Sequence, residues 1–339
     1  MDDLSPLHGA TDSGPEPLHD FSTNANPVPP CPAVRAAAVT RDPDPAYTAL
    51  RAGLAAAHGV SPDRIVVGAG ASELILRLVR RHDGTVTVLG PTFSEYARCA
   101  RLEDRRLREV TNPGLYLKIA AERESLGFVC WPNNPTGELW PTEFLERAAV
   151  SHTLVLDLAY APLCAEVPDA RLRSVMARSI CLHAPNKAFG LTGVRAAYAV
   201  LPAPDPRLGW LAPSWVLDAA GEAFLRATVE PEARQWLAAC RPLIAKMRCE
   251  LAAGLRGLGC EVRESPATFL LARVGEATAV TRELRARGLR VRDATSFGLP
   301  EHIRVSAAPL AAQERLLSEL SELLPHRACV ARQSTDISP

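Results

Sequence analysis

The feature that most constrains the fold is a series of short apolar runs that alternate with helix-like segments along the chain. Each run is flanked by glycine, proline or polar residues and is short for a core helix, so we interpret the runs as buried strands. Strands that alternate with helices predict an α/β fold, with a mostly parallel sheet of about seven strands and helices on both faces. The runs occupy residues 64–67, 85–89, 126–130, 153–156, 179–182 and 196–201.

The composition is that of an ordinary globular protein. Of 339 residues, 47% are apolar and 22% are charged, which suits one large α/β domain and a smaller one. The 38 basic and 38 acidic residues cancel, so no overall charge favours nucleic acid or a membrane surface. The nine cysteines form no CxxC pair and no metal-ligand cluster. With no apolar run of bilayer length and no signal sequence, we expect a soluble, cytoplasmic protein.

The chain divides into four predicted segments. The N-terminal arm, which includes a short helix at 31–39, is either a polar surface tail or part of a binding site. An amphipathic helix at 46–58 follows, and a long one at 231–258 carries an apolar stripe typical of core packing. The predicted segments are the arm at 1–40, a large domain at 41–228, a small α+β domain at 229–326 and a tail at 327–339.

Lys187 is the most informative single residue. It is one of only three lysines among 38 basic residues, it follows the buried run at 179–182, and it precedes a glycine-containing turn. A lysine at the end of a buried strand can lose its proton and form a Schiff base with an aldehyde cofactor. Arg195, eight residues later, could hold a phosphate. The alternative is a strand-end lysine that reaches into solvent.

Other polar residues also follow the predicted strands, where ligands of an open α/β sheet gather. Asp157 ends the run at 153–156 and needs a cationic partner, such as a pyridinium nitrogen. Tyr160 lies three residues later, and Asn134 lies in the turn WPNNPTG after another run.

A turn of small residues follows the strand at 64–67. Gly70 and Ala71 would let the backbone approach a ligand, and Ser72 begins a helix whose free N–H groups favour an anion. The same turn is also what an α/β protein uses to reverse direction. Phe93, after the next strand, could stack on a flat cofactor, although core packing explains it equally well.

Candidate substrate ligands lie near both ends of the chain. In the arm, LHGA at 7–10 and DFSTNANPV at 20–28 carry more hydrogen-bonding groups than a tail requires, which makes His8 and Asn24 candidates. In the small domain, Arg292 in VRDATSF and Arg304 in HIRVSAA are either site residues or solvated surface arginines.

The motifs GAGASELI, PTFSEY and PNNPTG, followed by Asp157 with Tyr160 and then Lys187 with Arg195, occur in an order that is specific to one superfamily. The chain resembles the fold type I enzymes of aminotransferase class I and II, which use pyridoxal 5′-phosphate (PLP). Within them it most resembles threonine-phosphate decarboxylases, and next histidinol-phosphate aminotransferases. The resemblance runs from residue 7 to the last predicted helix, and it implies a homodimer with shared active sites.

The resemblance also implies residue roles. Lys187 would carry PLP as a Schiff base, Asp157 would pair with the pyridine nitrogen, and Phe93 would stack on the ring. Arg304 would bind the substrate α-carboxylate, while Arg292 and His8 of the partner subunit would receive the substrate's own phosphate. The remaining cofactor contacts would be Asn134 and Tyr160 at the phenolic oxygen, and Gly70, Ala71, Ser72 and Arg195 around the phosphate.

Two departures from the family pattern affect the expected cofactor site. Asp42 stands where a tyrosine usually crosses the dimer interface toward the cofactor phosphate. The residues just before the lysine are Ala184, Pro185 and Asn186 instead of hydroxyl-bearing ones. These changes suggest a relative with an altered reaction.

Three functions therefore remain open. The first is decarboxylation or transamination of a phosphorylated amino acid. The second is elimination, replacement or carbon–carbon bond formation on an amino acid such as S-adenosylmethionine, in specialised metabolism. The third is a PLP-binding regulator, which would need a DNA-binding segment. The choice between the first two depends on which Cα bond the site holds perpendicular to the cofactor ring.

Overall fold

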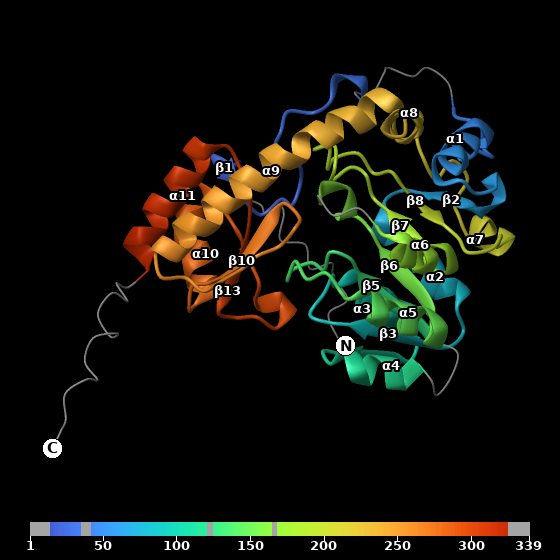
Figure 1. Cartoon of the computed structure of the whole chain (residues 1–339), viewed down its shortest axis with the longest axis horizontal. Helices are drawn as coiled ribbons and strands as arrows, with labels where there is room; N and C mark the ends of the chain where they lie inside the picture. Colours follow the sequence, from blue (N-terminus) through green and yellow to red (C-terminus); the bar gives the residue numbers. More distant parts are fainter. Residues whose placement is uncertain (1–13, 35–41, 121–124, 165–167, 325–339) are drawn as a thin grey trace.

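A seven-stranded sheet forms the centre of the larger of two lobes (Figure 1). The computed structural model describes residues 14–34, 42–120, 125–164 and 168–324. The strand order is β2-β8-β7-β6-β5-β3-β4; β8 is antiparallel to both of its neighbours and the other pairs are parallel, as the sequence predicts. The strands are β2 (Ile65–Gly68), β3 (Thr85–Leu89), β4 (Leu107–Val110), β5 (Ser125–Cys130), β6 (Thr153–Asp157), β7 (Ile180–His183) and β8 (Ala197–Val200).

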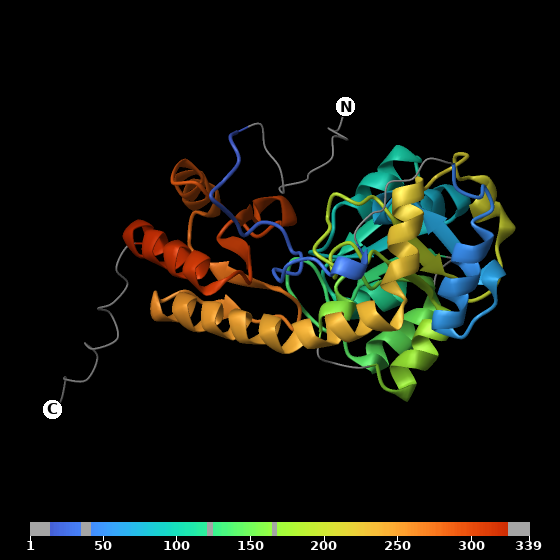
Figure 2. The ribbon, with the colours of Figure 1, turned by 90° about the horizontal axis from the view of Figure 1, so that it is seen from above.

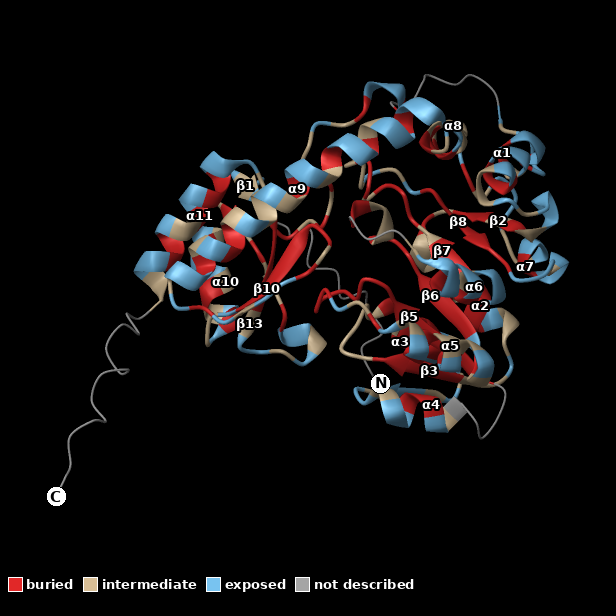
Figure 3. Cartoon of the chain, in the orientation of Figure 1, coloured by how far each residue is buried: buried red, intermediate tan, exposed pale blue. Residues whose placement is uncertain are grey.

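Helices lie on both sides of this sheet (Figure 2). The central strands β5 and β6 are almost wholly buried, whereas the helices are buried on one side and exposed on the other (Figure 3). The edge strand β4 was not predicted, because its sequence LREV is polar and lies at the surface. The helices of this lobe are α1 (Thr48–His58), α2 (Ala71–Arg81), α3 (Glu95–Leu102), α4 (Pro113–Ala120), α5 (Thr142–Ser151), α6 (Ala170–Arg178), α7 (Pro206–Trp210) and α8 (Ala219–Thr228).

The smaller lobe is built on a four-stranded antiparallel sheet of order β12-β13-β10-β9. Its two central strands have five residues each and its two edge strands have two. The elements are β9 (Val262–Arg263), β10 (Phe269–Arg273), β12 (Arg292–Asp293) and β13 (His302–Ser306), with α10 (Ala277–Ala286) and α11 (Leu310–Leu323) packed against them.

The N-terminal arm packs against the smaller lobe. Strand β1 (His19–Asp20) pairs in parallel with β11 (Leu289–Arg290), and Phe21 is fully buried in the core of that lobe. The sequence predicted no strand here, because the pairing joins segments about 270 residues apart. The predicted helix at 31–39 begins as a short 3-10 helix at Pro32–Val34, and its remainder lies outside the described residues.

Helix α9 (Pro231–Gly257) runs along both lobes (Figure 1). Its first half contributes Leu237 and Ile244 to the core of the larger lobe, and its last turns contribute Leu251 and Leu255 to the core of the smaller one. The apolar face of α9 is thus divided between two cores, although Leu243, which the predicted stripe included, is exposed. We keep the domain boundary at residue 228 as a proposal, with α9 as the element that joins the two domains. None of the described helices is long and apolar enough to cross a membrane.

Candidate active site

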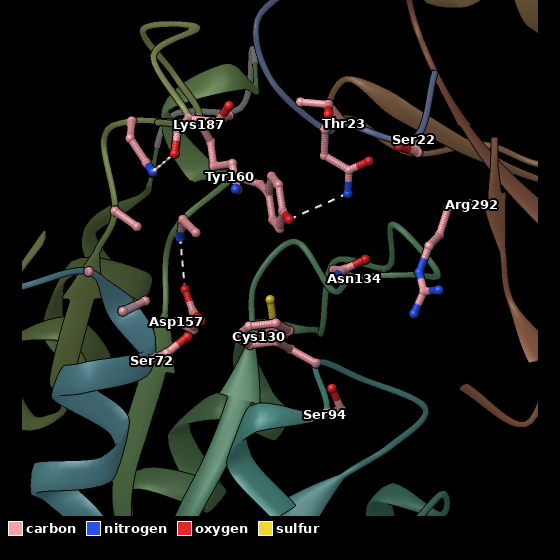
Figure 4. A pocket seen from close by; sticks show the side chains of 18 of the residues that line it. Ser22, Thr23, Ser72, Ser94, Cys130, Asn134, Asp157, Tyr160, Lys187 and Arg292 are labelled. Carbon is pink, nitrogen blue, oxygen red and sulfur yellow. Dashed lines mark hydrogen bonds between the residues drawn. The ribbon is translucent and has the colours of Figure 1, made fainter. Parts of the chain in front are cut away.

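A cavity of about 490 Å³ lies where the carboxyl ends of the parallel strands face the smaller lobe (Figure 4). Twelve of the thirteen site residues predicted from the sequence line it, and the thirteenth, His8, lies outside the described residues. Those of the larger lobe converge because the parallel strands place the residues after their carboxyl ends along one edge of the sheet, whereas Asn24 comes from the arm and Arg292 and Arg304 come from the smaller sheet. The twelve are Asn24, Gly70, Ala71, Ser72, Phe93, Asn134, Asp157, Tyr160, Lys187, Arg195, Arg292 and Arg304.

Lys187 follows β7 in a tight turn and points into the cavity (Figure 4). Burial, together with the nearby positive charges of Arg195 and Arg304, lowers the pKa of its amine to about 8, and the negative charge of Asp157 partly opposes this shift. Its backbone carbonyl accepts a hydrogen bond from the backbone N–H of Asn26 at 2.9 Å, which ties the arm to this turn. Near neutral pH, part of the amine is therefore uncharged and nucleophilic.

Asp157 ends β6 at the floor of the cavity and is buried. Burial raises the pKa of its carboxyl, while hydrogen bonds from the Tyr96 hydroxyl at 2.7 Å and the Ala159 N–H at 3.0 Å lower it. A buried carboxylate with these donors favours a cation on its open side. The sequence analysis did not select Tyr96, although it ends the motif PTFSEY.

A recess for an anion is formed at the beginning of α2. The helix begins at Ala71, one residue earlier than predicted, and its N-terminal N–H groups are free for a ligand. Gly70 has a positive φ of 99°, and a Cβ placed on it would lie 2.7 Å from Nη2 of Arg195. Only glycine leaves room here for the guanidinium of Arg195 beside the helix N-terminus.

Tyr160 is held by the N-terminal arm. Asn24 donates from Nδ2 to the Tyr160 hydroxyl at 3.4 Å, and the Oδ1 of Asn24 accepts from Ser306 at 3.0 Å. Burial raises the pKa of Tyr160 to about 12, so its hydroxyl keeps its proton. Phe93 lines the cavity and meets the Tyr96 ring edge-on, with 5.6 Å between ring centroids.

Arg292 and Arg304 stand opposite one another on β12 and β13. Opposite residues of an antiparallel pair project from the same face of the sheet, so both guanidiniums are on the cavity side. Arg304 donates to the Oδ1 of Asn134 and to the carbonyl of Ser22 at 2.9 Å, and burial lowers its pKa to about 10. In the described parts of the chain, neither guanidinium forms a salt bridge with a carboxylate.

The departures near Lys187 also face the cavity. Ala184 and Asn186 line it, and Asn186 donates from Nδ2 to the backbone carbonyls of Thr192 and Val194 at 3.4 and 3.1 Å. Asn186 thus holds the turn, while Asp42 is exposed at the surface.

Further lining residues that the sequence analysis did not select are Ser22, Thr23, Ser94, Cys130, Ala159, Thr192, Gly193 and Phe297. Most of them lie one or two residues from a predicted site residue, and this nearness in the sequence is the signal that could have identified them.

Comparison with known proteins identifies the family. The model of aminotransferase class I and II matches residues 16–319. The chain belongs to the aminotransferase class I and II family. A histidinol-phosphate aminotransferase of Nitratidesulfovibrio vulgaris is 31% identical over 341 aligned positions, covering 90% of this chain and 88% of that protein.

Solved structures show the same fold for this family member. Histidinol-phosphate aminotransferase from Sinorhizobium meliloti, in complex with PLP, has a TM-score of 0.79 and 21% identity, with 91% of each chain covered. L-Threonine-O-3-phosphate decarboxylase from Porphyromonas gingivalis has a TM-score of 0.75 and 20% identity, with 90% of this chain and 99% of that chain covered. The fold is therefore that of the type I PLP enzymes.

The relatives support the aminotransferase alternative better than the decarboxylase that the sequence analysis favoured. For the aminotransferase the likeness is one of sequence, at 31% identity, whereas for the decarboxylase it is one of fold, at 20% identity.

The cofactor of this family is PLP, and the cavity has the chemistry to hold it. It offers an amine with a lowered pKa at Lys187, a buried carboxylate at Asp157 and an anion recess between Gly70 and Arg195. The amine suits the aldehyde of PLP, the carboxylate suits its pyridine nitrogen, and the recess suits its phosphate.

Proposed function

We propose that this chain is an aminotransferase of the histidinol-phosphate type, whose two substrates are a primary amine that carries a phosphate and an amino acid that carries two carboxylates. The observation that carries this proposal is the pairing of Arg292 with Arg304 on one face of the small sheet. Two cations directly opposite one another repel, and the charge of Arg292 helps burial to lower the pKa of Arg304. Such a pair suits a substrate that brings its own anionic groups.

We assign the cofactor contacts as follows. PLP, when bound, supplies an electron-withdrawing ring that stabilises negative charge at the substrate Cα. Asp157 would keep the pyridine nitrogen protonated, and Tyr160 and Asn134 would donate to the phenolic oxygen. Ala71, Ser72 and Arg195, around the recess at the beginning of α2, would hold the phosphate, and Phe93 would hold the ring.

Lys187 is assigned as the base that moves a proton from the substrate Cα. Its pKa of about 8 leaves it able both to take and to return a proton near neutral pH. Asn26 holds its backbone carbonyl, which limits the positions from which the amine can act.

Arg304 and Arg292 are assigned to the substrate's anionic groups. Arg304 is buried, and Asn134 and Ser22 fix two of its nitrogens, so its guanidinium is oriented before a substrate arrives. Arg292 enters the cavity from the opposite side to Asp157 (Figure 4). Both assignments rest on charge and placement.

The experiment is an assay of the PLP-loaded protein with histidinol phosphate and 2-oxoglutarate, with glutamate measured by mass spectrometry. We expect glutamate to form in proportion to histidinol phosphate consumed. O-Phosphothreonine is tested in parallel, and carbon dioxide is measured. Carbon dioxide from O-phosphothreonine, with no glutamate from any phosphorylated amine, would overturn the proposal in favour of the decarboxylase. A different product from S-adenosylmethionine would favour elimination or carbon–carbon bond formation.

We also propose a homodimer whose partner completes the site. The arm lines the cavity at Ser22, Thr23 and Asn24, and the family resemblance assigns His8, which precedes them in the chain, to the site of a neighbouring subunit. Light scattering should give twice the mass of 36.5 kDa. A fully active monomer would contradict the proposal.

A further inference from the structure

The turn after β12 contacts the side chain of Arg292. It is a short 3-10 helix, η4 (Thr295–Phe297), ended by Gly298 with a positive φ of 77°. Arg292 donates from Nη2 to the Ser296 hydroxyl at 2.7 Å, and its guanidinium carbon lies 5.0 Å from the centre of the Phe297 ring. A hydroxyl and an aromatic face orient a guanidinium, but neither neutralises its charge.

Asp293, the acidic residue next to Arg292, forms its hydrogen bonds with other residues. The carboxylate of Asp293 accepts from the backbone N–H of Thr295 at 2.8 Å and from the hydroxyl of Thr278 at 2.7 Å. Successive residues of a strand project to opposite faces, so Asp293 is directed away from the cavity side on which Arg292 lies. Asp293 thus anchors η4 to α10. Its negative charge raises the pKa of Arg292, but its hydrogen bonds are to Thr278 and Thr295, and the guanidinium of Arg292 donates to Ser296 instead.

Phe297 also separates two cavities. It lines the main cavity and a second one of about 520 Å³, which lies between η4 and the segment after β3. Phe93 and Ser94 line both cavities as well. The Phe297 ring is therefore placed to limit water at the guanidinium, and an ion pair formed there is less screened than one in open solvent.

We propose that Phe297 and Ser296 are positioning residues that set the preference of this site for a substrate with a second anionic group. Phe297 contributes more to this preference than Ser296, because the Phe297 ring both orients the guanidinium of Arg292 and limits water there, whereas Ser296 is exposed. The inference rests on the proposed function in one respect: Arg292 must face the substrate.

The test compares two ligands that cannot react, glutarate and valerate, which both have five carbons but carry two carboxylates and one. Dissociation constants are measured by calorimetry on the PLP-loaded protein. We expect Phe297→Leu to weaken glutarate about 5- to 20-fold and Ser296→Ala about 2- to 5-fold, with valerate changed less than about twofold. Phe297→Tyr and Ser296→Thr, which keep the aromatic face and the hydroxyl, should restore glutarate binding.

The control variant is Ser321→Ala, which removes an exposed hydroxyl on α11 and should leave both constants unchanged. Equal losses for both ligands, or an unchanged preference in Phe297→Leu, would overturn the inference while Arg292 keeps its role. If the parent protein itself binds glutarate and valerate equally, the assignment of Arg292 to a second anionic group fails instead. A variant that unfolds is replaced by Phe297→Met, and the same comparison applies.

Discussion

The hydroxyl of Tyr96 donates a hydrogen bond to Oδ2 of Asp157 at 2.7 Å, beneath the floor of the cavity. Tyr96 is fully buried, and its ring stacks on Phe128 with 4.8 Å between centroids. The charged form of a buried carboxylate depends on such donors. The Tyr96 hydroxyl therefore helps Asp157 to stay ionised and able to hold a cation.

Tyr96→Phe should weaken cofactor binding. The substitution removes the hydroxyl whose hydrogen bond lowers the pKa of Asp157. The Asp157 carboxyl then takes up a proton at higher pH and holds the pyridine nitrogen less well. We expect the dissociation constant for PLP to rise about tenfold or more, and PLP to be lost at higher pH than in the parent during acidification. Absorbance titrations across pH check this. Identical constants at every pH would show that Tyr96 serves only packing.

Lys187 should be the lysine that reacts with PLP. Because its pKa is about 8, the rate of reaction of the cofactor-free protein should rise with pH up to about 8 and then level off. Stopped-flow absorbance measures the rate, and borohydride reduction with peptide mapping locates the modified residue. PLP found on Lys118 or Lys246 would refute the assignment.

Burial of Lys187 should also cost stability. Its pKa is lowered from 10.5 to about 8, so the unfolded chain binds more protons, and the cost is fully present below pH 8 and disappears as the pH rises through 10.5. Lys187→Met should stabilise the cofactor-free protein by up to about 3 kcal/mol at pH 7, and by progressively less above pH 8. Urea unfolding at several pH values checks this. A pH-independent difference would mean that the amine is solvated.

Gly70→Ala should damage the anion recess. The added methyl group would lie 2.7 Å from Nη2 of Arg195, at a φ of 99° that side-chain-bearing residues rarely adopt. We expect PLP to bind about 10- to 100-fold more weakly, from strain of roughly 1–3 kcal/mol. Gly53→Ala is the matched control, because nothing lies within 4 Å of its Cβ position on the exposed side of α1. Equal behaviour of the two variants would place the phosphate elsewhere.

Arg304→Ala and Arg292→Ala should affect different ligands. Arg304→Ala removes a buried, oriented guanidinium and should weaken every carboxylate ligand by roughly 2–4 kcal/mol, while PLP stays bound. Arg292→Ala should weaken ligands with a second anionic group and leave singly charged ones nearly unchanged. Small and equal losses would show that neither arginine faces the substrate.

The sequence by itself determined the fold class and many of the residues that line the cavity. The alternation of apolar runs with helices follows from local periodicity, and parallel strands necessarily bring the residues after Leu89, Cys130 and Asp157 to one edge of the sheet. Lys187 was conspicuous because lysine is rare in this chain.

Only the tertiary structure decided the contacts between distant segments. The opposition of Arg292 and Arg304 depends on strand register, and the hydrogen bond from Tyr96 depends on how α3 packs against the sheet at β3 and β4. The contact of Asn24 with Tyr160 joins residues 136 positions apart. These pairings are set by packing and closure of long loops, and no local pattern encodes them. The sequence therefore supplies the chemical groups of the site, and their pairing across the fold decides which of them are charged, oriented and free to bind.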